Sequence, residues 1–423
     1  MDTIFRDVFS ELTAELGKPE VMVLLGPRQV GKTTLLRSLE KYVAGLGAKT
    51  LFFDLEQPSD LRTLSGDEAD VIAMLINDAD YVFIDEFYYL KNAGHIFKAV
   101  YDKCCFQDKK VKIIVSGSSS VEIHRHLQDG QSLAGRHMVF RVFPLSYSEF
   151  LSGHGDAALF DRFLTYGGMP GLALEDDSGR KQNLLQNYVT AYLLSDVRGM
   201  VETAQLQDFN KVLYAIADDQ GALINSASLA EQLNIPEHTV EQSLSVMQQT
   251  HSIYELNSYR PRRVTELRHY RKCYLYDLGI RNSILKDFRL PSLRHDARRI
   301  YESFVVLSLV PRLAPNIELR FWQVSKGERV DFVLLIDREP IPIVLDLDLK
   351  AGAIHHGFTA FRRDCTELRR TLTITRHPFE TIMQDGVSHE FVSLKDVSSI
   401  LPMPASSIFE PPESPLKRSG VAI

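Results

Sequence analysis

The sequence predicts an α/β protein that begins with a parallel sheet and continues with a helical region, a helix-turn-helix domain and a second α/β domain. Three observations predict this order. Between residues 1 and 150, short apolar runs alternate with amphipathic stretches, which is the rhythm of strands and crossover helices in a parallel sheet. Residues 157–200 have a helical pattern, and three further helical stretches followed by two β-like runs lie between 205 and 276. After residue 296, strand-like and helix-like stretches alternate again.

A glycine-bounded loop follows the first predicted strand, at residues 21–25, and leads directly into a helix. Its pattern is G-x-x-x-x-G-K-[ST], in which the glycines allow tight turns that aim backbone N–H groups at phosphate oxygens. The lysine brings positive charge to the β- and γ-phosphates, and the next hydroxyl can ligate Mg²⁺. A chance glycine turn before a helix is the alternative. We expect the loop to bind ATP with Mg²⁺ through Gly26, Pro27, Arg28, Gln29, Val30, Gly31, Lys32, Thr33 and Thr34.

Two further strand ends supply candidates for hydrolysis. The apolar strand at 81–84 ends in Asp85 and Glu86, and ligands of α/β sheets bind at the carboxyl ends of strands. We expect Asp85 to hold Mg²⁺ through water and Glu86 to polarise the attacking water. The strand at 111–115 ends in a run of serines, of which Ser116 could sense the γ-phosphate. An ordinary serine-rich turn is the alternative for Ser116.

Composition narrows the class of protein. The 423 residues are 44% hydrophobic and 24% charged, which is typical of a globular protein with about two to three domains. The N-terminus lacks the features of a signal peptide, and no apolar run is long enough to span a membrane, so we expect no membrane association. Four cysteines without zinc or disulfide spacing favour the cytoplasm. The net charge of −7 argues against a uniformly basic coat for nucleic acid, although not against local basic patches.

The rest of the chain divides where its pattern changes. Helices expected at 209–217, 226–233 and 236–247, followed by two β-like runs, predict a winged helix-turn-helix, with a plain helical lid as the alternative. We expect an ATPase core at residues 1–150, a helical lid or linker at 151–204, the winged helix at 205–295, a second α/β domain at 296–401 and a disordered, proline- and serine-rich tail at 402–423.

With these motifs in place, the chain resembles a large prokaryotic family of AAA-type (AAA+) P-loop ATPases that carry a C-terminal domain of unknown function. The resemblance covers roughly residues 15–395 and rests on an ordered series of motifs. After the loop and Asp85-Glu86 come the serine strand end, L-A-G-R at 133–136, F-P-L-S-Y-S-E-F at 143–150, Y-G-G-M-P at 166–170, Asp196, Y-L-Y-D-L-G at 274–279 and Y-E-S-F-V at 301–305. It implies a self-associating ATPase, expected to form a homo-oligomeric ring, and leaves the substrate open.

The resemblance also draws attention to two arginines. Arg136 lies where the family keeps a Gly-Arg pair, and it could reach the γ-phosphate bound to a neighbouring subunit as an arginine finger. A structural ion pair is the alternative for Arg136. Arg28 could contact phosphate or a neighbouring subunit, but a solvated loop charge is its expected role.

The last predicted domain contains a second group of candidate catalytic residues. Glu302 lies on a predicted helix at 299–310, Asp331 lies on a strand at 329–336, and Asp348 and Lys350 close the next strand. Residues two apart share a strand face, so antiparallel pairing should bring all four side chains into one small cleft. The α-β-β-β-α-β order resembles restriction-endonuclease-like nucleases, in which carboxylates hold Mg²⁺ and a lysine positions water. The alternatives are ordinary half-exposed strands and a degenerate domain that binds without cutting.

Basic residues are concentrated at 258–299, where twelve oppose four acidic residues and give a local net charge of +8. Such a segment beside a helix-turn-helix is the expected footprint of phosphate contact. The DNA-binding candidates are Arg260, Arg262, Arg263, Arg268, Arg271 and Lys272. In the alternative, these charges pair with acidic surfaces of the protein itself or of a neighbouring subunit.

Together, these features predict an ATPase that binds DNA and couples ATP hydrolysis to remodelling or translocation of DNA, on branched or duplex substrates in repair or genome defence. The rival prediction is a nucleotide switch that controls a protein partner and has no DNA motor activity. The preferred DNA structure, the ring size and the pathway are not contained in the sequence.

Overall fold

The computed structural model describes residues 4–106, 110–118, 133, 135–152, 159–192, 197, 200–201, 205–260, 270–324 and 327–401. Within this part of the chain, every helix is too short or too polar to cross a lipid bilayer.

The first sheet is formed by short, mainly apolar runs. Its strands are β1 (Val21–Leu25), β2 (Thr50–Asp54), β3 (Tyr81–Asp85), β4 (Lys112–Gly117) and β5 (His137–Arg141), in the order β2-β3-β4-β1-β5. All of these pairings are parallel, as predicted. The carboxyl ends of β1, β3 and β4 therefore meet at one edge of the sheet. Successive residues of β1 belong to cores on opposite faces of the sheet, which explains why the whole strand is apolar.

Helices cover both faces of this sheet. They are α1 (Val8–Ala14), α2 (Lys32–Gly45), α3 (Pro58–Leu64), α4 (Glu68–Asp78) and α5 (Ala93–Phe106), with a short 3₁₀ turn η1 (Phe87–Tyr89). Apolar side chains of α2 pack against one face with Met22 and Leu24. Those of α4 and α5 pack against the other face with Val21 and Val23.

A largely helical part follows the sheet. Its first helices are α7 (Tyr147–Ser152), α8 (Leu159–Tyr166), α9 (Pro170–Ala173) and α10 (Ser178–Tyr192). After them come α11 (Leu206–Asp218), β6 (Leu223–Ile224), α12 (Ser226–Leu233), α13 (Glu237–Gln249), β7 (Ile253–Asn257), β8 (Arg271–Leu275) and α14 (Leu278–Leu285). The three strands form an antiparallel sheet in the order β6-β8-β7.

The helix N-cap expected at Ser226 is one residue off, because the side chain of Asn225 caps α12 by accepting from the N–H of Ser228. The predicted connection at 234–236 is present. Asn234 adopts the left-handed conformation that ends α12, and Pro236 precedes α13.

The second large sheet has six strands in the order β13-β14-β12-β11-β10-β9 and mixes parallel with antiparallel pairs. Its strands are β9 (Ile317–Gln323), β10 (Arg329–Ile336), β11 (Glu339–Leu345), β12 (Arg370–Thr375), β13 (Ile382–Gln384) and β14 (Val387–Ser393). The accompanying helices are η4 (Pro291–Leu293), α15 (Ala297–Leu309), η5 (Val310–Arg312), α16 (Gly357–Asp364) and η6 (Leu394–Ile400).

One predicted boundary in this part is wrong. The strand expected to include Asp348 and Lys350 ends at Leu345, because the chain turns at Asp346, where the N–H of Leu349 approaches the Asp346 carbonyl. Alternation of apolar and polar residues alone did not distinguish a strand from the turn that follows it.

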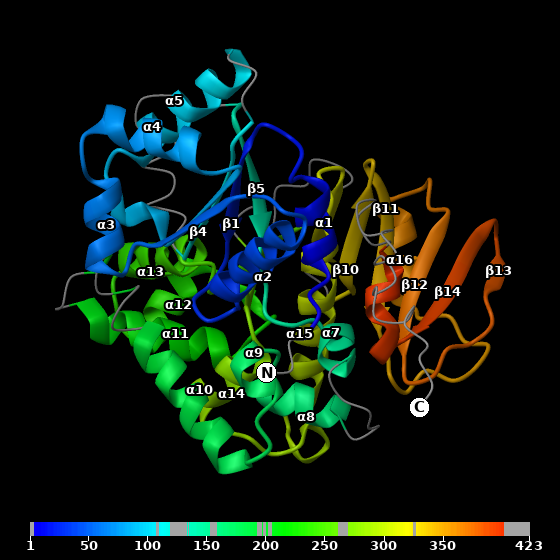
Figure 1. Cartoon of the computed structure of the whole chain (residues 1–423). Coiled ribbons are helices and arrows are strands. Elements are labelled where there is room, and N and C mark those ends of the chain that lie inside the picture. The colour runs from blue at the N-terminus through cyan, green and yellow to red at the C-terminus, as the bar shows by residue number, and fades with distance from the viewer. Residues whose placement is uncertain are drawn as a thin grey trace, which may run out of the picture.

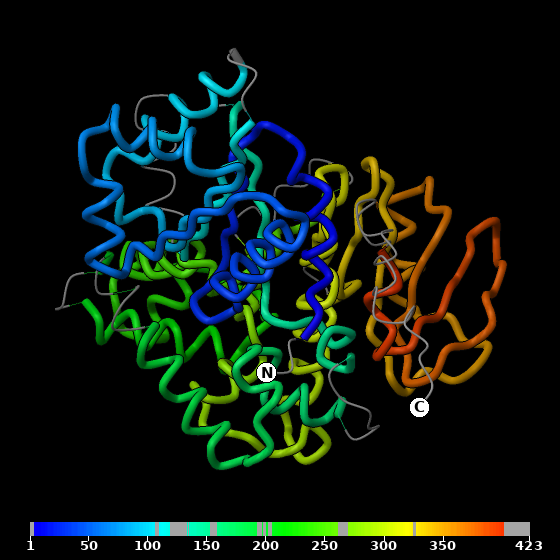
Figure 2. Tube along the Cα trace, in the orientation of Figure 1, coloured from blue at the N-terminus to red at the C-terminus, as the bar shows by residue number. Residues whose placement is uncertain are grey.

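Figure 1 shows the first sheet with α2 and α5 in blue and cyan, α10–α13 in green beside it, and the six-stranded sheet in yellow to red at the other side. The tube in Figure 2 shows the yellow-green and yellow chain from α14 through α15 passing between the first sheet and the six-stranded sheet. The parts are therefore in contact along the middle of the molecule.

The contact between α8 and α14 is especially close. The side-chain amide of Asn282 on α14 donates to the carbonyls of Leu164 (3.1 Å) and Thr165 (2.9 Å) at the end of α8. A Cβ atom at Gly279 would lie 2.0 Å from the carbonyl oxygen of Tyr166. Only glycine allows the two backbones to approach in this way.

We expect Gly279→Ala to lower the melting temperature (Tm) by several degrees, because the added methyl group forces the two backbones apart at a cost of about 1–3 kcal/mol. Gly45→Ala at the end of α2 is the matched control, since nothing lies within 4 Å of a Cβ there. The control should match the wild-type Tm or exceed it. Thermal unfolding followed by circular dichroism measures both, and equal Tm values for Gly279→Ala and wild type would contradict this account of the contact.

Candidate functional site

The loop between β1 and α2 has the conformation that its glycines allow. Gly31 has a φ of +94° and caps α2, and Gln29 also lies in the left-handed region, with a φ of 64°. Gly26 is needed for a different reason, because a Cβ there would lie 2.1 Å from the carbonyl oxygen of Val142. The loop therefore turns back tightly between a neighbouring backbone and the N-terminus of a helix, where N–H groups favour anions.

The side chain of Lys32 lies within this loop and is buried. Its ammonium group donates to the carbonyls of Gly26 (2.9 Å) and Pro27 (2.8 Å). These contacts hold the positive charge at the mouth of the loop. The ammonium is thus close to the position that the sequence assigns to phosphate.

Three oxygen-bearing side chains meet at the carboxyl ends of β3 and β4 and the start of α2. The hydroxyl of Thr33 donates to Asp85 Oδ2 (2.6 Å), and the hydroxyl of Ser116 donates to Asp85 Oδ1. Asp85 is buried, and each of its carboxylate oxygens accepts one of these hydrogen bonds. Hydroxyl and carboxylate oxygens are the ligands that Mg²⁺ prefers, and the residues present therefore fit this ion.

Glu86 follows Asp85 in a left-handed backbone conformation, with φ 51° and ψ 50°. Its carboxylate accepts from the hydroxyl of Ser118 (3.4 Å), and its backbone N–H approaches Ser116 Oγ (3.3 Å). Burial raises the pKa of Glu86, whereas the positive charges of Lys32 and Arg28 oppose this rise. A carboxylate with a raised pKa beside a phosphate loop is suited to accept a proton from water.

A hollow of about 710 Å³ adjoins the loop. Apolar side chains from four separate segments line it, among them Phe5, Phe9, Leu35, Leu145 and Pro170. Gly31 and Thr34 form its border with the loop. A flat apolar group attached to a phosphate chain, such as a nucleotide base, fits this combination of surfaces.

The two arginines named from the sequence lie in different places. Arg28 is partly exposed and lies 4.0 Å from Glu56, close enough to act on the charge of Glu86. Arg136 precedes β5 and lies at the amino end of the sheet, because its carbonyl accepts from the N–H of Val21. It is therefore far from the loop of its own chain. Its guanidinium pairs with Asp102 (3.1 Å), the structural contact considered as its alternative role.

Sequence reasoning missed several residues at this site. Arg6 donates to the carbonyl of Val30 within the loop, and Pro170 lies next to Gly31. Tyr88 and Ser118 interact with Glu86. The Y-G-G-M-P motif pointed toward Pro170, but no local pattern marks Arg6 as part of a site. Asp196 lies outside the described residues.

The predicted cleft of four residues in the C-terminal domain is not assembled. Glu302 and Asp331 do lie together, but Arg298 pairs with both, at 3.0 Å and 2.8 Å. Asp331 also accepts from the N–H of Leu345.

Asp348 and Lys350 are exposed beyond the end of β11, and the side chain of Asp348 is 93% exposed near Arg376. The prediction fails because the strand ends before these residues. Among the described residues, no group of three His, Cys, Asp or Glu side chains is arranged to hold a metal ion.

Most of the described basic residues at 258–299 are paired within the protein. Lys272 is only 5% exposed and lies over the ring of Phe321, and Arg271 pairs with Glu241 and Glu255. Lys272 therefore cannot contact DNA without unfolding of this region, and its assignment is wrong. The guanidinium of Arg260 donates to Ser258. Arg262, Arg263 and Arg268 lie outside the described residues.

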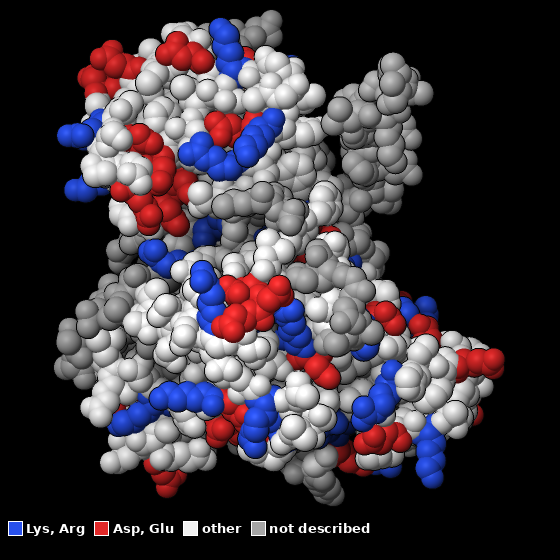
Figure 3. Space-filling view, turned by 60° about the horizontal axis from the view of Figure 1, so that its bottom comes forward, with Lys and Arg blue, Asp and Glu red and all other residues white. Residues whose placement is uncertain are grey.

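Other basic residues of the segment 258–299 are buried as well. Arg281 and Arg294 are buried and both pair with Asp296. On the face shown in Figure 3, blue and red side chains of the described residues are interspersed, without a continuous field of one sign. The high positive charge along the sequence is thus largely neutralised by contacts inside the fold.

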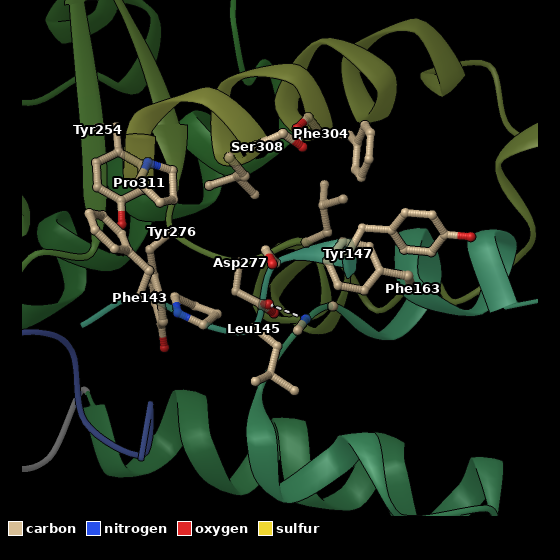
Figure 4. A pocket seen from close by; sticks show the side chains of 16 residues that line it. Phe143, Leu145, Tyr147, Phe163, Tyr254, Tyr276, Asp277, Phe304, Ser308 and Pro311 are labelled. Carbon is tan, nitrogen blue, oxygen red and sulfur yellow. Dashed lines mark hydrogen bonds between the residues drawn. The ribbon is translucent and has the colours of Figure 1, made fainter. Parts of the chain in front are cut away.

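A small cavity of about 30 Å³ lies where the parts of the molecule meet. Figure 4 shows Asp277 between two groups of aromatic side chains, with Phe143 and Tyr254 on one side and Tyr147 and Phe304 on the other. This volume holds about two water molecules and is too small for a substrate. Asp277 accepts from the N–H groups of Gly168 (2.7 Å) and Ile280 (2.9 Å), and it thereby joins the turn before α9 to the start of α14.

We expect Asp277 to make stability depend on pH. Burial raises its pKa to about 6, and backbone N–H donors oppose this rise only in part. Since the folded state then binds the proton more tightly than the unfolded state, the contribution of Asp277 to stability is present below about pH 4 and is lost as the pH rises through 6. The Tm of wild type relative to Asp277→Asn should fall between pH 4 and 6 and then level off, and a difference that stays constant over this range would show that Asp277 is ionised throughout.

Comparison with known proteins agrees with the first part of this description. Residues 18–151 match the family described as AAA domain, and residues 157–290 match a domain of unknown function. An uncharacterised protein of Mycobacterium tuberculosis is 25% identical over 337 residues, which are 79% of this chain and 72% of that protein. An uncharacterised protein of Methanocaldococcus jannaschii is 22% identical over 397 residues, which are 88% and 86% of the two chains.

Solved structures resemble the fold more distantly. DnaA of Aquifex aeolicus bound to AMPPCP has a TM-score of 0.33 at 12% identity, with 59% of this chain and 90% of that chain covered. RuvB of Thermotoga maritima has a TM-score of 0.32 at 16% identity, with 59% and 88% covered. These scores are too low to support an inference about function. The α/β fold class and an AAA-type first domain are confirmed, whereas the winged-helix and nuclease-like assignments stay predictions.

Proposed function

We propose that this protein binds ATP with Mg²⁺ and hydrolyses it at the site between β1, β3 and β4. The observation that carries the proposal is the cluster of Thr33, Asp85 and Ser116 next to the loop that contains Lys32. In this assignment the loop N–H groups and Lys32 bind the phosphates, and the apolar hollow takes the base. Mg²⁺, when bound, neutralises phosphate charge, and Thr33 and Asp85 are the residues that would hold it.

The side chains beside the cluster complete the proposed reaction. Glu86 would orient a water molecule toward the γ-phosphate and accept its proton, because it lies beside the loop and burial raises its pKa. Ser116, hydrogen-bonded to Asp85 and close to the N–H of Glu86, would link the carboxylate of Asp85 to the backbone of Glu86 and sense the phosphate.

We expect Lys32→Ala to weaken ATP binding at least tenfold, since it removes a charged donor from the phosphates. Glu86→Gln should keep the Kd for ATP near that of wild type and lower kcat by about a hundredfold or more. Lys41→Ala, an exposed change on the same helix α2, is the control and should alter neither quantity. Isothermal titration and a phosphate-release assay give the two values. Wild-type turnover by Glu86→Gln would mean that another residue activates water.

A second proposal, DNA binding, is supported by one arrangement. Three helices and the sheet β6-β8-β7 have the element order of a winged helix, and the connection between β7 and β8 carries Arg260, Arg262, Arg263 and Arg268 with one acidic residue, Glu266. In a winged helix this connection is the wing that contacts the phosphate backbone.

We also propose that the C-terminal domain, from its element order, has a restriction-endonuclease-like fold. This domain would not cut DNA, because Arg298 neutralises its carboxylates.

We also propose that copies of this protein assemble into a homo-oligomeric ring. Arg136 is far from the loop of its own chain, so any role in catalysis would require the site of a neighbouring subunit. If the protein does not bind DNA, the switch interpretation holds, in which ATP controls a protein partner and turnover is slow and unaffected by DNA.

We expect the triple change of Arg260, Arg262 and Arg263 to Ala to weaken DNA binding and to leave basal ATPase activity intact. Each lost phosphate contact should reduce the slope of log K against log salt concentration by about 0.9. A control with Lys41, Lys49 and Lys91 changed to Ala removes the same charge from exposed positions on the first domain. Fluorescence anisotropy with single-stranded, duplex and four-way-junction DNA over a salt series measures the slope, and equal slopes for both triple variants would remove the wing from the proposal.

A further inference from the structure

We propose that Arg6, which borders the apolar hollow, and Glu149 are a positioning pair that orients the phosphate-binding loop; this inference rests on the proposed ATP-binding function. Neither residue belongs to the loop or to the carboxylate cluster. Arg6 precedes α1, and Glu149 lies on α7, more than a hundred residues away in the sequence.

The guanidinium of Arg6 joins three separate segments. It donates to the carbonyl of Val30 through Nη1 (2.8 Å), to the carbonyl of Phe143 through Nη2 (2.6 Å) and to Glu149 Oε1 through Nε (3.1 Å). Arg6 and Glu149 are both buried. The planar guanidinium fork of arginine can serve these three acceptors at once, whereas a lysine ammonium would reach fewer of them in the same geometry.

The contact with Val30 determines where the loop aims its next N–H group. In a planar trans peptide, the N–H points away from the C=O of the same peptide unit. Because Arg6 holds the carbonyl of Val30, the N–H of Gly31 must point to the opposite side. This peptide unit rotates about bonds of Val30 and Gly31. Gly31 has a φ of +94° and, as a glycine, few steric limits on φ, so the unit could rotate if nothing held its carbonyl. Arg6 therefore maintains the orientation that an anion-binding loop requires.

Glu149 is itself fixed by the F-P-L-S-Y-S-E-F motif. The N–H of Ser146 donates to Glu149 Oε2 (2.8 Å), and the N–H of Glu149 approaches Ser146 Oγ (3.2 Å), which is the reciprocal pattern of a capping box at the start of α7. The N–H of Asp7 adds a further bond to Glu149 Oε1 (2.7 Å). The motif thus places one carboxylate that neutralises Arg6 and holds it under the loop.

The charge balance indicates that Arg6 acts through the loop and not as a phosphate ligand. Its charge is offset by Glu149 at 3.1 Å, and three of its five N–H groups donate to Glu149 and to the two carbonyls. Loop N–H groups contact phosphates equally before and during the reaction, so losing their alignment weakens binding without a matching loss of turnover. We expect a rise in the Kd and KM for ATP with nearly unchanged kcat at saturating ATP.

The test compares Arg6→Ala, Arg6→Lys and Glu149→Ala with the double variant Arg6→Ala/Glu149→Ala. Each single change to Ala should raise the Kd for MgATP about tenfold or more, and the double variant should be no worse than the weaker-binding single variant, because the pair acts as a unit. Arg6→Lys keeps the charge and should recover only part of the affinity. It also serves as the informative variant if Arg6→Ala does not fold.

Two controls separate positioning from loss of stability. Lys211→Ala removes an exposed ion pair with Asp208, and Ile374→Ala destabilises the distant six-stranded sheet. Both should keep the wild-type Kd for MgATP, the second despite a lower Tm. Wild-type affinity in both Arg6 variants would overturn the positioning role, and so would a Kd that rises in Ile374→Ala as much as in Arg6→Ala. Absence of MgATP binding by the wild type would instead reject the proposed function.

Discussion

The orientation of the peptide groups between β1 and α2 is the constraint on which the candidate site depends. The carbonyls of Gly26 and Pro27 accept from Lys32, that of Val30 accepts from Arg6, and that of Gly31 accepts from the N–H of Leu35 in α2. Because Arg6 holds the carbonyl of Val30, the N–H of Gly31 in the same peptide unit faces the opposite side. An anion site made of backbone dipoles requires this orientation, because a single reversed peptide would present a carbonyl oxygen to phosphate.

Ion pairs with at least one buried partner explain why charge along the sequence and charge on the surface differ. Arg281 and Arg294 converge on Asp296, and Arg298 lies between Glu302 and Asp331. Removing one partner from such a pair leaves an uncompensated buried charge, which is far more costly than losing a surface ion pair. These pairs therefore hold α14, α15 and β10 together. They also occupy the carboxylates that a metal-dependent nuclease would need.

Close backbone contacts connect the candidate nucleotide site to the rest of the chain. Pro170 lies beside Gly31, and the turn before it is bound to Asp277 and approached by α14 at Gly279. Helix α14 in turn packs on α11 and α10. A displacement of the turn at residues 167–170 would thus be passed to the helical part without intervening solvent, since packed interiors transmit strain. This contiguity is the physical basis on which a nucleotide-dependent change could reach the later domains.

The strands and the loop of the first domain could be predicted from the sequence alone, because the features that predict them lie within a few residues of one another. A five-residue apolar run, a glycine loop and a following helix are set by backbone conformation and burial within a few residues, and the carboxylates after β3 follow from the parallel arrangement of the strands. Only the tertiary structure decided the partners of charged residues. The neighbouring residues in the sequence do not show the environment of Lys272, Arg298 or Asp348. Lys272 is buried, Arg298 bridges two carboxylates, and Asp348 lies in solvent. The role of Arg6 was likewise invisible, because its partners Val30, Phe143 and Glu149 meet it only when distant segments pack together.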